Sequence, residues 1–243
     1  MREFTINAKK SIIPSLDVST LEGMNEIVSA THDLQGIGGY KIGFSLGLRF
    51  GLPKVMQQIR DITQKPVIYD HQKGATDIPD TAKQFAEACA EAGVTSVIYY
   101  PQSGPQSLKK WIEEPQKQGL GVIVGTEMTH PGFLKSEGGF IDDQAPFKML
   151  EIALEMGVTE FAVPGNKPQK ILEYRKLIEQ KLAAGKYSLY SPGLVAQGGE
   201  VSESARAAGE RWHAIIGRAI YGLNSIEEMR RAAENYSNAL EGE

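Results

Sequence analysis

The sequence has very little cysteine: Cys89 is the single one among 243 residues. One cysteine cannot form a disulfide within the chain, and a metal site built on thiolates needs several. This excludes a disulfide-stapled scaffold and is typical of a reducing compartment. The four histidines show no ligand spacing, so we expect no metal site; they are at positions 32, 71, 130 and 213.

Long apolar runs are also absent. The runs present are short, such as VIYY at 97–100 and AII at 214–216, whereas a membrane-spanning helix needs about 18 apolar residues. The N-terminal segment MREFTINAKKSIIPSLD lacks a long apolar stretch followed by a small-residue cleavage site, as a secretory signal requires. We therefore expect a cytoplasmic protein with no membrane partner.

The chain carries little net charge, with 26 basic against 30 acidic residues and a balance of -4. A nucleic-acid-binding protein presents a basic face, so this balance argues against a nucleic-acid partner. It still allows a small phosphorylated ligand, because local backbone N–H groups bind phosphate whatever the net charge. With 41% hydrophobic residues, the chain is not disordered and can bury a substantial core.

What the sequence does contain is an alternation of short β-branched or aromatic runs with helical patterns. The runs are apolar without strict alternation, as in strands that are buried on both faces. We expect eight strands, at 11–17, 40–43, 66–70, 96–100, 121–127, 160–165, 187–193 and 213–218. Apolar residues at helical spacing predict helices that include 80–93, 146–157, 168–185 and 225–240.

This alternation predicts an α/β fold, a single (β/α)8 TIM barrel that forms one domain over residues 1–243. An open doubly wound sheet is the alternative. It is less favoured because it usually has fewer strands, and because no G-x-G-x-x-G follows the first strand of this sequence.

Polar residues follow the predicted strands, at the end where TIM barrels carry their functional groups. Asp17, Lys41, Asp70 and Lys73 lie at or just after the first three strands. Lys41 lies within an apolar strand, so its side chain must point out of the core or be paired. Four charges of alternating sign in these positions indicate a functional site rather than ordinary charged residues on the surface.

The later strands end in different polar groups. Thr126-Glu127-Met128-Thr129 follows the fifth strand, and Gln197-Gly198-Gly199 and Gly217-Arg218 follow the seventh and eighth. A long irregular stretch at 129–143 is typical of a ligand-facing loop. His213 precedes an apolar run, so we interpret it as a barrel-end residue rather than a catalyst.

The segment YDHQKGATDIPDT at 69–81 resembles the Asp-x-Lys-x-x-Asp-Ile-Pro-x-Thr motif of orotidine 5′-phosphate decarboxylases. Further resemblances follow in the same order between residues 14 and 221. They are the first-strand aspartate in PSLD (14–17), the second-strand lysine in YKIG (40–43), the pyrimidine loop MTHPG (128–132), the phosphate loop PGLVAQGG (192–199) and the final phosphate turn IGRAIY (216–221). Thr129 stands where a serine is usual.

The resemblance implies decarboxylation of orotidine 5′-phosphate to uridine 5′-phosphate in pyrimidine biosynthesis, with no cofactor. Lys73 is then the cation and the proton donor at C6 of the pyrimidine, because a lysine can supply both. Asp70 keeps Lys73 protonated and positioned. Lys41 holds Asp70 and a ribose hydroxyl, and Asp17 accepts a hydrogen bond from the ribose.

The remaining roles implied by the resemblance concern the base, the phosphate and a second subunit. Thr129 meets the amide edge of the pyrimidine. Asp77, Ile78 and Thr81 come from the other subunit of a homodimer with shared active sites. The phosphate is bound by the turns after the last two strands, through Gln197, Gly198, Gly217 and Arg218.

One departure concerns spacing. Two residues separate Asp70 from Lys73 and three separate Lys73 from Asp77, where the family has one and two. Residues two apart in a strand face the same side, and residues three apart do not. The chain must therefore bulge or leave the strand at His71-Gln72 to bring Asp70 and Lys73 together, and Gly74 makes this easier.

Two other functions stay open. One is a magnesium-dependent sugar-phosphate decarboxylase or aldolase-like barrel, and the other is a non-catalytic barrel that binds a phosphorylated ligand. The Asp-Ile-Pro-x-Thr run and the Gln-Gly-Gly loop favour the nucleotide enzyme over the first.

Overall fold

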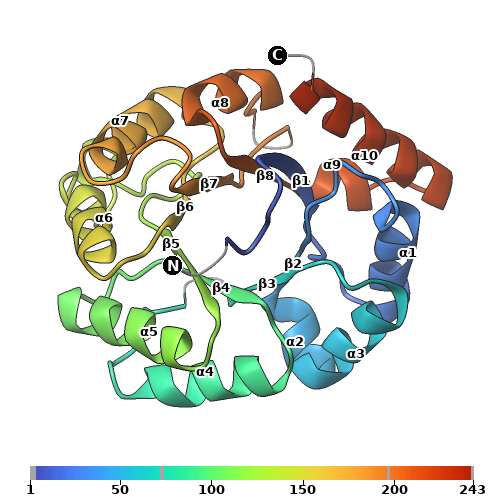
Figure 1. The fold of residues 1–243 in the computed structure, drawn as a ribbon, viewed down its shortest axis with the longest axis horizontal. Coiled ribbons are helices and arrows are strands. Elements are labelled where there is room, and N and C mark those ends of the chain that lie inside the picture. Colours follow the sequence, from blue (N-terminus) through green and yellow to red (C-terminus); the bar gives the residue numbers. More distant parts are fainter. Residues whose placement is uncertain (1–3, 72–73, 196–197, 242–243) are drawn as a thin grey trace.

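Eight parallel strands form a barrel in the computed structural model, which describes residues 4–71, 74–195 and 198–241 (Figure 1). The strands pair in the order β1-β8-β7-β6-β5-β4-β3-β2. Their bounds are β1 Lys10–Pro14, β2 Tyr40–Gly43, β3 Val67–Asp70, β4 Ser96–Tyr99, β5 Gly121–Gly125, β6 Glu160–Ala162, β7 Ser188–Ser191 and β8 Trp212–Ile216. Just beyond β1, Leu16 N donates to Lys41 O at 2.7 Å and brings β2 alongside. The predicted eight strands and the barrel are confirmed.

Helices surround the barrel, as Figure 1 shows. Their bounds are α1 Leu21–Thr31, α2 Phe44–Phe50, α3 Leu52–Ile62, α4 Thr81–Glu91, α5 Pro105–Lys117, η1 Lys135–Glu137, α6 Ala145–Glu155, α7 Pro168–Glu179, α8 Val201–Ala208, α9 Arg218–Tyr221 and α10 Ile226–Glu241. The helix predicted at 168–185 ends earlier, at Glu179. Just after this point, Gln180 N and Lys181 N bond three residues back, to Leu177 O at 3.2 Å and Ile178 O at 3.0 Å, and the chain turns. Among the helices of the described residues, none combines the length and the hydrophobicity that a membrane-spanning helix needs.

The strands are buried on both faces, which explains their unbroken apolar runs. Ile13, Ile68, Ile98 and Ile123 belong to one buried cluster with Tyr190 and Ile215. Alternate residues such as Ile12 and Ile42 pack with the helices in a second cluster. Successive strand side chains point to opposite faces, so the first cluster fills the barrel and the second joins the barrel to its helices.

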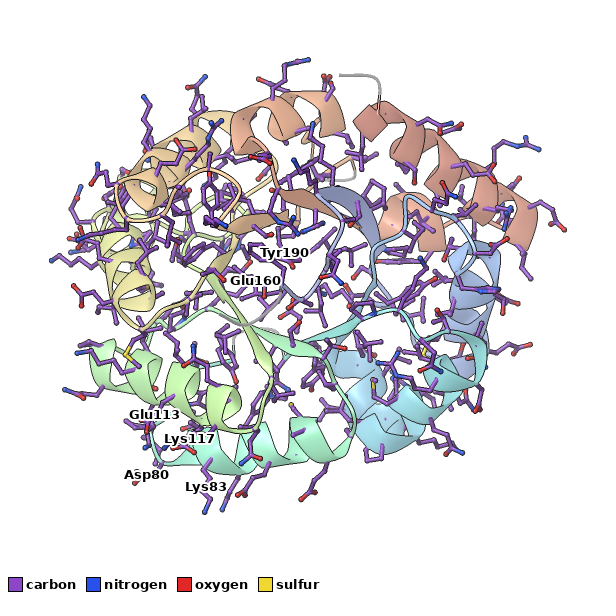
Figure 2. The ribbon with its side chains drawn as sticks, viewed as in Figure 1. Asp80, Lys83, Glu113, Lys117, Glu160 and Tyr190 are labelled. Atoms are coloured by element: carbon purple, nitrogen blue, oxygen red, sulfur yellow. The ribbon has the colours of Figure 1, made fainter. Side chains whose placement is uncertain are left out.

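Residues 4–9 pack against the amino-terminal end of the barrel. Thr5 donates to both carboxylate oxygens of Glu160, through its N–H at 3.1 Å and its hydroxyl at 2.8 Å. Tyr190 donates to the same carboxylate at 2.5 Å. Figure 2 shows the side chains of Glu160 and Tyr190 near the barrel centre. Arg211 donates to the carbonyls of Ile6, Asn7 and Ala8. These contacts fix the segment at the end of the barrel opposite the candidate site.

Candidate active site

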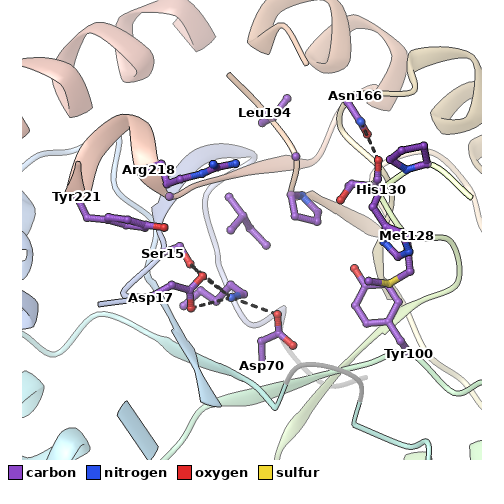
Figure 3. A pocket seen from close by; sticks show the side chains of 17 residues that line it. Ser15, Asp17, Asp70, Tyr100, Met128, His130, Asn166, Leu194, Arg218 and Tyr221 are labelled. Carbon is purple, nitrogen blue, oxygen red and sulfur yellow. Dashed lines mark hydrogen bonds and ion pairs between the residues drawn. The ribbon is translucent and has the colours of Figure 1, made fainter. Parts of the chain in front are cut away.

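A pocket of about 530 Å³ opens at the carboxyl ends of the strands (Figure 3). This volume lies in the range of about 300–1,000 Å³ that small-molecule sites occupy. Its lining comes from segments far apart in the sequence, because the ends of parallel barrel strands converge at one rim. The lining residues are Ser15, Asp17, Lys41, Asp70, Tyr100, Met128, Thr129, His130, Pro131, Asn166, Pro192, Gly193, Leu194, Ile215, Gly217, Arg218 and Tyr221.

A buried lysine lies between two carboxylates on one side of this pocket. Lys41 is 4% exposed, and its Nζ lies 3.2 Å from Asp17 Oδ2 and 3.2 Å from Asp70 Oδ2. Ser15 Oγ donates to Asp17 Oδ2 at 2.6 Å and fixes that carboxylate. The structure therefore pairs Lys41, as its place in an apolar strand requires.

The two aspartates keep Lys41 charged. Burial alone lowers the pKa of an amine, but the charges of Asp70 and Asp17 outweigh it and raise the pKa of Lys41 above its usual value. Three strands supply the three groups: Asp17 follows β1, Lys41 lies in β2 and Asp70 ends β3. The pocket thus holds a fixed cation with two hydrogen-bond-accepting carboxylates.

Arg218 lies at one end of the pocket, beside Tyr221 (Figure 3). Gly217 directly follows the last strand, and a Cβ on it would lie 3.2 Å from the Tyr221 ring, so the turn is tightly packed. Gly199 packs as closely, because a Cβ there would lie 2.7 Å from the Gly165 carbonyl oxygen. Gly198, in contrast, is exposed with φ +87° and is not among the lining residues. Gln197 lies outside the described residues.

Met128, His130 and Tyr100 lie toward the other end (Figure 3). Thr129, between Met128 and His130 in the chain, lines the pocket as well. The Tyr100 ring lies over Gly125, where a Cβ would come within 2.6 Å of it. Asn166 Nδ2 donates to the Thr129 carbonyl oxygen at 2.9 Å. The pocket therefore runs from a guanidinium, past the lysine and its aspartates, to a mixed polar and apolar end.

The predicted residues after β3 are placed differently. Asp77 and Ile78 line a second hollow of about 330 Å³ and are not among the residues that line the main pocket. Ile78 is 61% exposed, while its carbonyl accepts from Thr81 Oγ1 at 2.8 Å and from Trp111 Nε1 at 3.2 Å. The backbone of this loop is thus held while the Ile78 side chain faces outward.

Lys73 and Gln72 lie outside the described residues, so the expected bulge is not tested. The residues on either side are held. His71 Nδ1 lies 2.6 Å from Tyr69 Oη, and burial lowers the pKa of His71 below its usual value, against the opposing charge of Asp70. Gly74 O accepts from Tyr100 N at 3.0 Å.

Comparison with known proteins decides the family. The model of the orotidine 5′-phosphate decarboxylase / HUMPS family matches residues 10–233. This chain belongs to that family. An orotidine 5′-phosphate decarboxylase of Methanosarcina barkeri is 33% identical over 238 residues, which cover 97% of this chain and 96% of the relative. That of Methanococcoides burtonii is 31% identical over 223 residues, covering 92% and 95%.

A solved structure of the same family has the same fold. The orotidine 5′-monophosphate decarboxylase of Methanocaldococcus jannaschii, in complex with the inhibitor BMP, matches with a TM-score of 0.81 and 25% identity. The match covers 96% of this chain and 99% of that one.

Among the described residues, no three His, Cys, Asp or Glu side chains form a group that could hold a metal ion.

Several lining residues are not among the site residues that the sequence predicts, among them Ser15, Tyr100, Asn166 and Tyr221. All four lie at most five residues beyond the end of a strand. The rule that polar groups gather at the carboxyl ends of strands applies to them. Examining every polar residue near each predicted strand end would have found them.

Proposed function

We propose that this protein decarboxylates orotidine 5′-phosphate to uridine 5′-phosphate, a step of pyrimidine biosynthesis. The observation that carries the proposal is the buried Lys41 between Asp17 and Asp70, in a pocket that Arg218 and Thr129 also line. Membership of the family and its relatives named as orotidine 5′-phosphate decarboxylases support it. The relative solved with the inhibitor BMP supports a small-molecule ligand.

The pocket suggests how the nucleotide binds. Its phosphate lies at Gly217 and Arg218, where a guanidinium gives a charge-assisted hydrogen bond. Gln197 and Gly198 contribute from the neighbouring turn in this proposal. The ribose lies along Asp17 and Lys41, which accept from and donate to its hydroxyls.

The base then extends toward Thr129, which bonds to its amide edge. The bond from C6 to the carboxylate breaks, CO2 leaves, and the electron pair stays on C6. Lys73 gives a proton to C6 and becomes a neutral amine that is reprotonated from solvent. Asp70 holds Lys73 in its charged form and lies beside the substrate carboxylate. A fixed cation stabilises the developing charge because it needs no reorganisation during the reaction.

The protein acts as a homodimer in this proposal, with Asp77, Ile78 and Thr81 reaching the partner's pocket. The exposed Ile78 side chain and the place of Asp77 away from the main pocket of its own chain support this. An isologous interface gives two equivalent sites, each with the pocket of one chain and the loop of the other.

The activity is tested with purified protein, orotidine 5′-phosphate and an excess of EDTA. We expect decarboxylation that EDTA does not change. Inhibition by EDTA, restored by magnesium, would instead support the sugar-phosphate enzyme. Nucleotide binding without turnover would support a binding protein. Either of these results contradicts the proposal.

The shared site is tested with two inactive variants, Asp77→Asn and Lys73→Ala, unfolded and refolded together in equal amounts. Random pairing makes about half of the dimers mixed, and one site of each mixed dimer has both residues intact, so about a quarter of wild-type activity returns. If Asp77 acts in its own chain, every site carries a lesion. Background activity with mixed dimers confirmed by mass spectrometry contradicts the shared site but not the decarboxylase.

A further inference from the structure

The β5–α6 loop, residues 126–144, carries Thr129 and is held by the neighbouring β6–α7 loop. Two consecutive residues of that second loop make the contacts. Asn166 Nδ2 donates to Thr129 O at 2.9 Å. Lys167 Nζ lies 2.8 Å from Glu127 Oε1 and 2.7 Å from Glu137 Oε1. One ammonium group therefore joins two carboxylates that are ten positions apart in the same loop.

Glu127 anchors the root of the loop to the barrel. Its side chain is 0% exposed, and Tyr174 on α7 donates a hydrogen bond to its second oxygen. A carboxylate is buried at low cost only when it is paired and its hydrogen bonds are satisfied. Lys167 and Tyr174 provide both, which explains why a residue at a strand end points away from the pocket.

Glu137 holds the middle of the loop, on the short helix η1. Its Oε2 accepts from Phe133 N at 3.1 Å and from Leu134 N at 3.5 Å. The hydrogen bond from Lys167 holds the pKa of Glu137 below its usual value, so Glu137 is charged at neutral pH. The segment from Met128 to Leu134, which faces the pocket through Thr129, is thus fixed at both ends.

We infer that Lys167 is a positioning residue that sets the choice of base, by holding Thr129 in place through Glu127 and Glu137. This rests on the proposed function, in which Thr129 bonds to the edge of the base. Uracil and cytosine differ in the donors and acceptors on that edge. If the loop were flexible, it would lose conformational entropy on closing around the correct base, and this loss would reduce the preference for that base. A loop that is ordered before binding avoids this loss and discriminates between the two bases more strongly.

The test measures dissociation constants by calorimetry for uridine 5′-monophosphate, cytidine 5′-monophosphate and ribose 5-phosphate. Glu137→Gln removes the charge that ties the loop to Lys167 but keeps Glu127 paired. Lys167→Met removes both contacts. We expect each variant to lower the preference for the uridine over the cytidine nucleotide by about 2- to 10-fold, the range for one lost hydrogen bond. Binding of ribose 5-phosphate, which has no base, stays at the wild-type value.

Two further variants serve as controls. Glu173→Gln removes a similar surface pair on α7, Lys170–Glu173 at 2.8 Å, and we expect it to leave all three constants unchanged. Lys167→Arg keeps the cation and restores most of the preference. If Lys167→Met does not fold, Glu137→Gln decides the question, because its side chain is at the surface, 29% exposed.

The inference is overturned if Glu137→Gln retains the wild-type preference, or if it weakens all three ligands equally, since that indicates general damage to the pocket. These results leave the proposed function intact when the wild-type protein still decarboxylates orotidine 5′-phosphate. A wild-type protein without that activity contradicts the proposed function itself, and the inference is overturned with it.

Discussion

His213 is a neutral histidine inside the barrel, and its burial makes stability depend on pH. The side chain is 0% exposed, its Nδ1 lies 2.8 Å from Ser11 Oγ, and its ring packs against Tyr190 with centroids 4.8 Å apart. Burial, together with the positive charge of Arg211, lowers the pKa of His213 from 6.5 to about 3. The unfolded chain therefore takes up a proton at mild acidity that the folded chain does not.

The sign and size of the effect follow from linkage. Above pH 6.5 both states carry a neutral imidazole, so the histidine adds no pH dependence. As the pH falls from 6.5 toward 3, the unfolded state is stabilised by protonation, and the free energy of unfolding decreases by up to about 1.4 kcal/mol per pH unit. Between pH 7 and pH 5, this one group lowers the stability by about 2 kcal/mol.

Urea unfolding at pH 7 and pH 5 measures this loss for the wild type and His213→Gln. We expect the variant to lose about 2 kcal/mol less than the wild type between the two pH values, whatever its stability at pH 7. Ser11→Ala is the matched control. It removes the hydrogen-bond partner but leaves the imidazole buried, so its pH dependence stays close to that of the wild type. Equal pH dependence in the wild type and His213→Gln refutes the reasoning.

Three other changes address the site. Lys73→Ala lowers kcat by at least about 10²–10⁴-fold, as expected for loss of a general acid. Calorimetry then gives near-wild-type affinity for uridine 5′-monophosphate. Near-normal turnover would contradict the role of Lys73 as the general acid. Arg218→Ala weakens binding of that nucleotide by roughly 10- to 150-fold, the value of one charged hydrogen bond. Uridine, without the phosphate, binds as before, and equal effects on both ligands contradict a phosphate contact. Lys41→Met leaves Asp17 and Asp70 without the cation between them, so we expect it to abolish activity. We also expect thermal unfolding at pH 7 to show a destabilisation of about 3–5 kcal/mol. Unchanged turnover would contradict a role of Lys41 and its two aspartates in the reaction.

The barrel and the order of its parts follow from the sequence pattern alone. Runs that are apolar on both faces, alternating with helical patterns, leave few folds other than a parallel sheet covered by helices. Because parallel strands end at one rim, the positions of Asp17, Lys41 and Asp70 in the chain already placed them near one another. The apolar neighbours of Lys41 also required the pairing that the structure contains.

Which polar residues face the pocket depends on contacts that form only in the folded barrel. Glu127 follows a strand and Asp70 ends one, yet the Glu127 side chain contacts Lys167 and Tyr174 and does not line the pocket. Gly198 also follows a strand, but it is exposed and does not line the pocket either. The contact between Thr5 and Glu160 joins residues 155 positions apart. Local periodicity indicates whether a side chain is buried, but its partner is set by distant segments that meet only when the barrel closes. For the same reason, the sequence could not predict the Lys167 contacts that hold the β5–α6 loop.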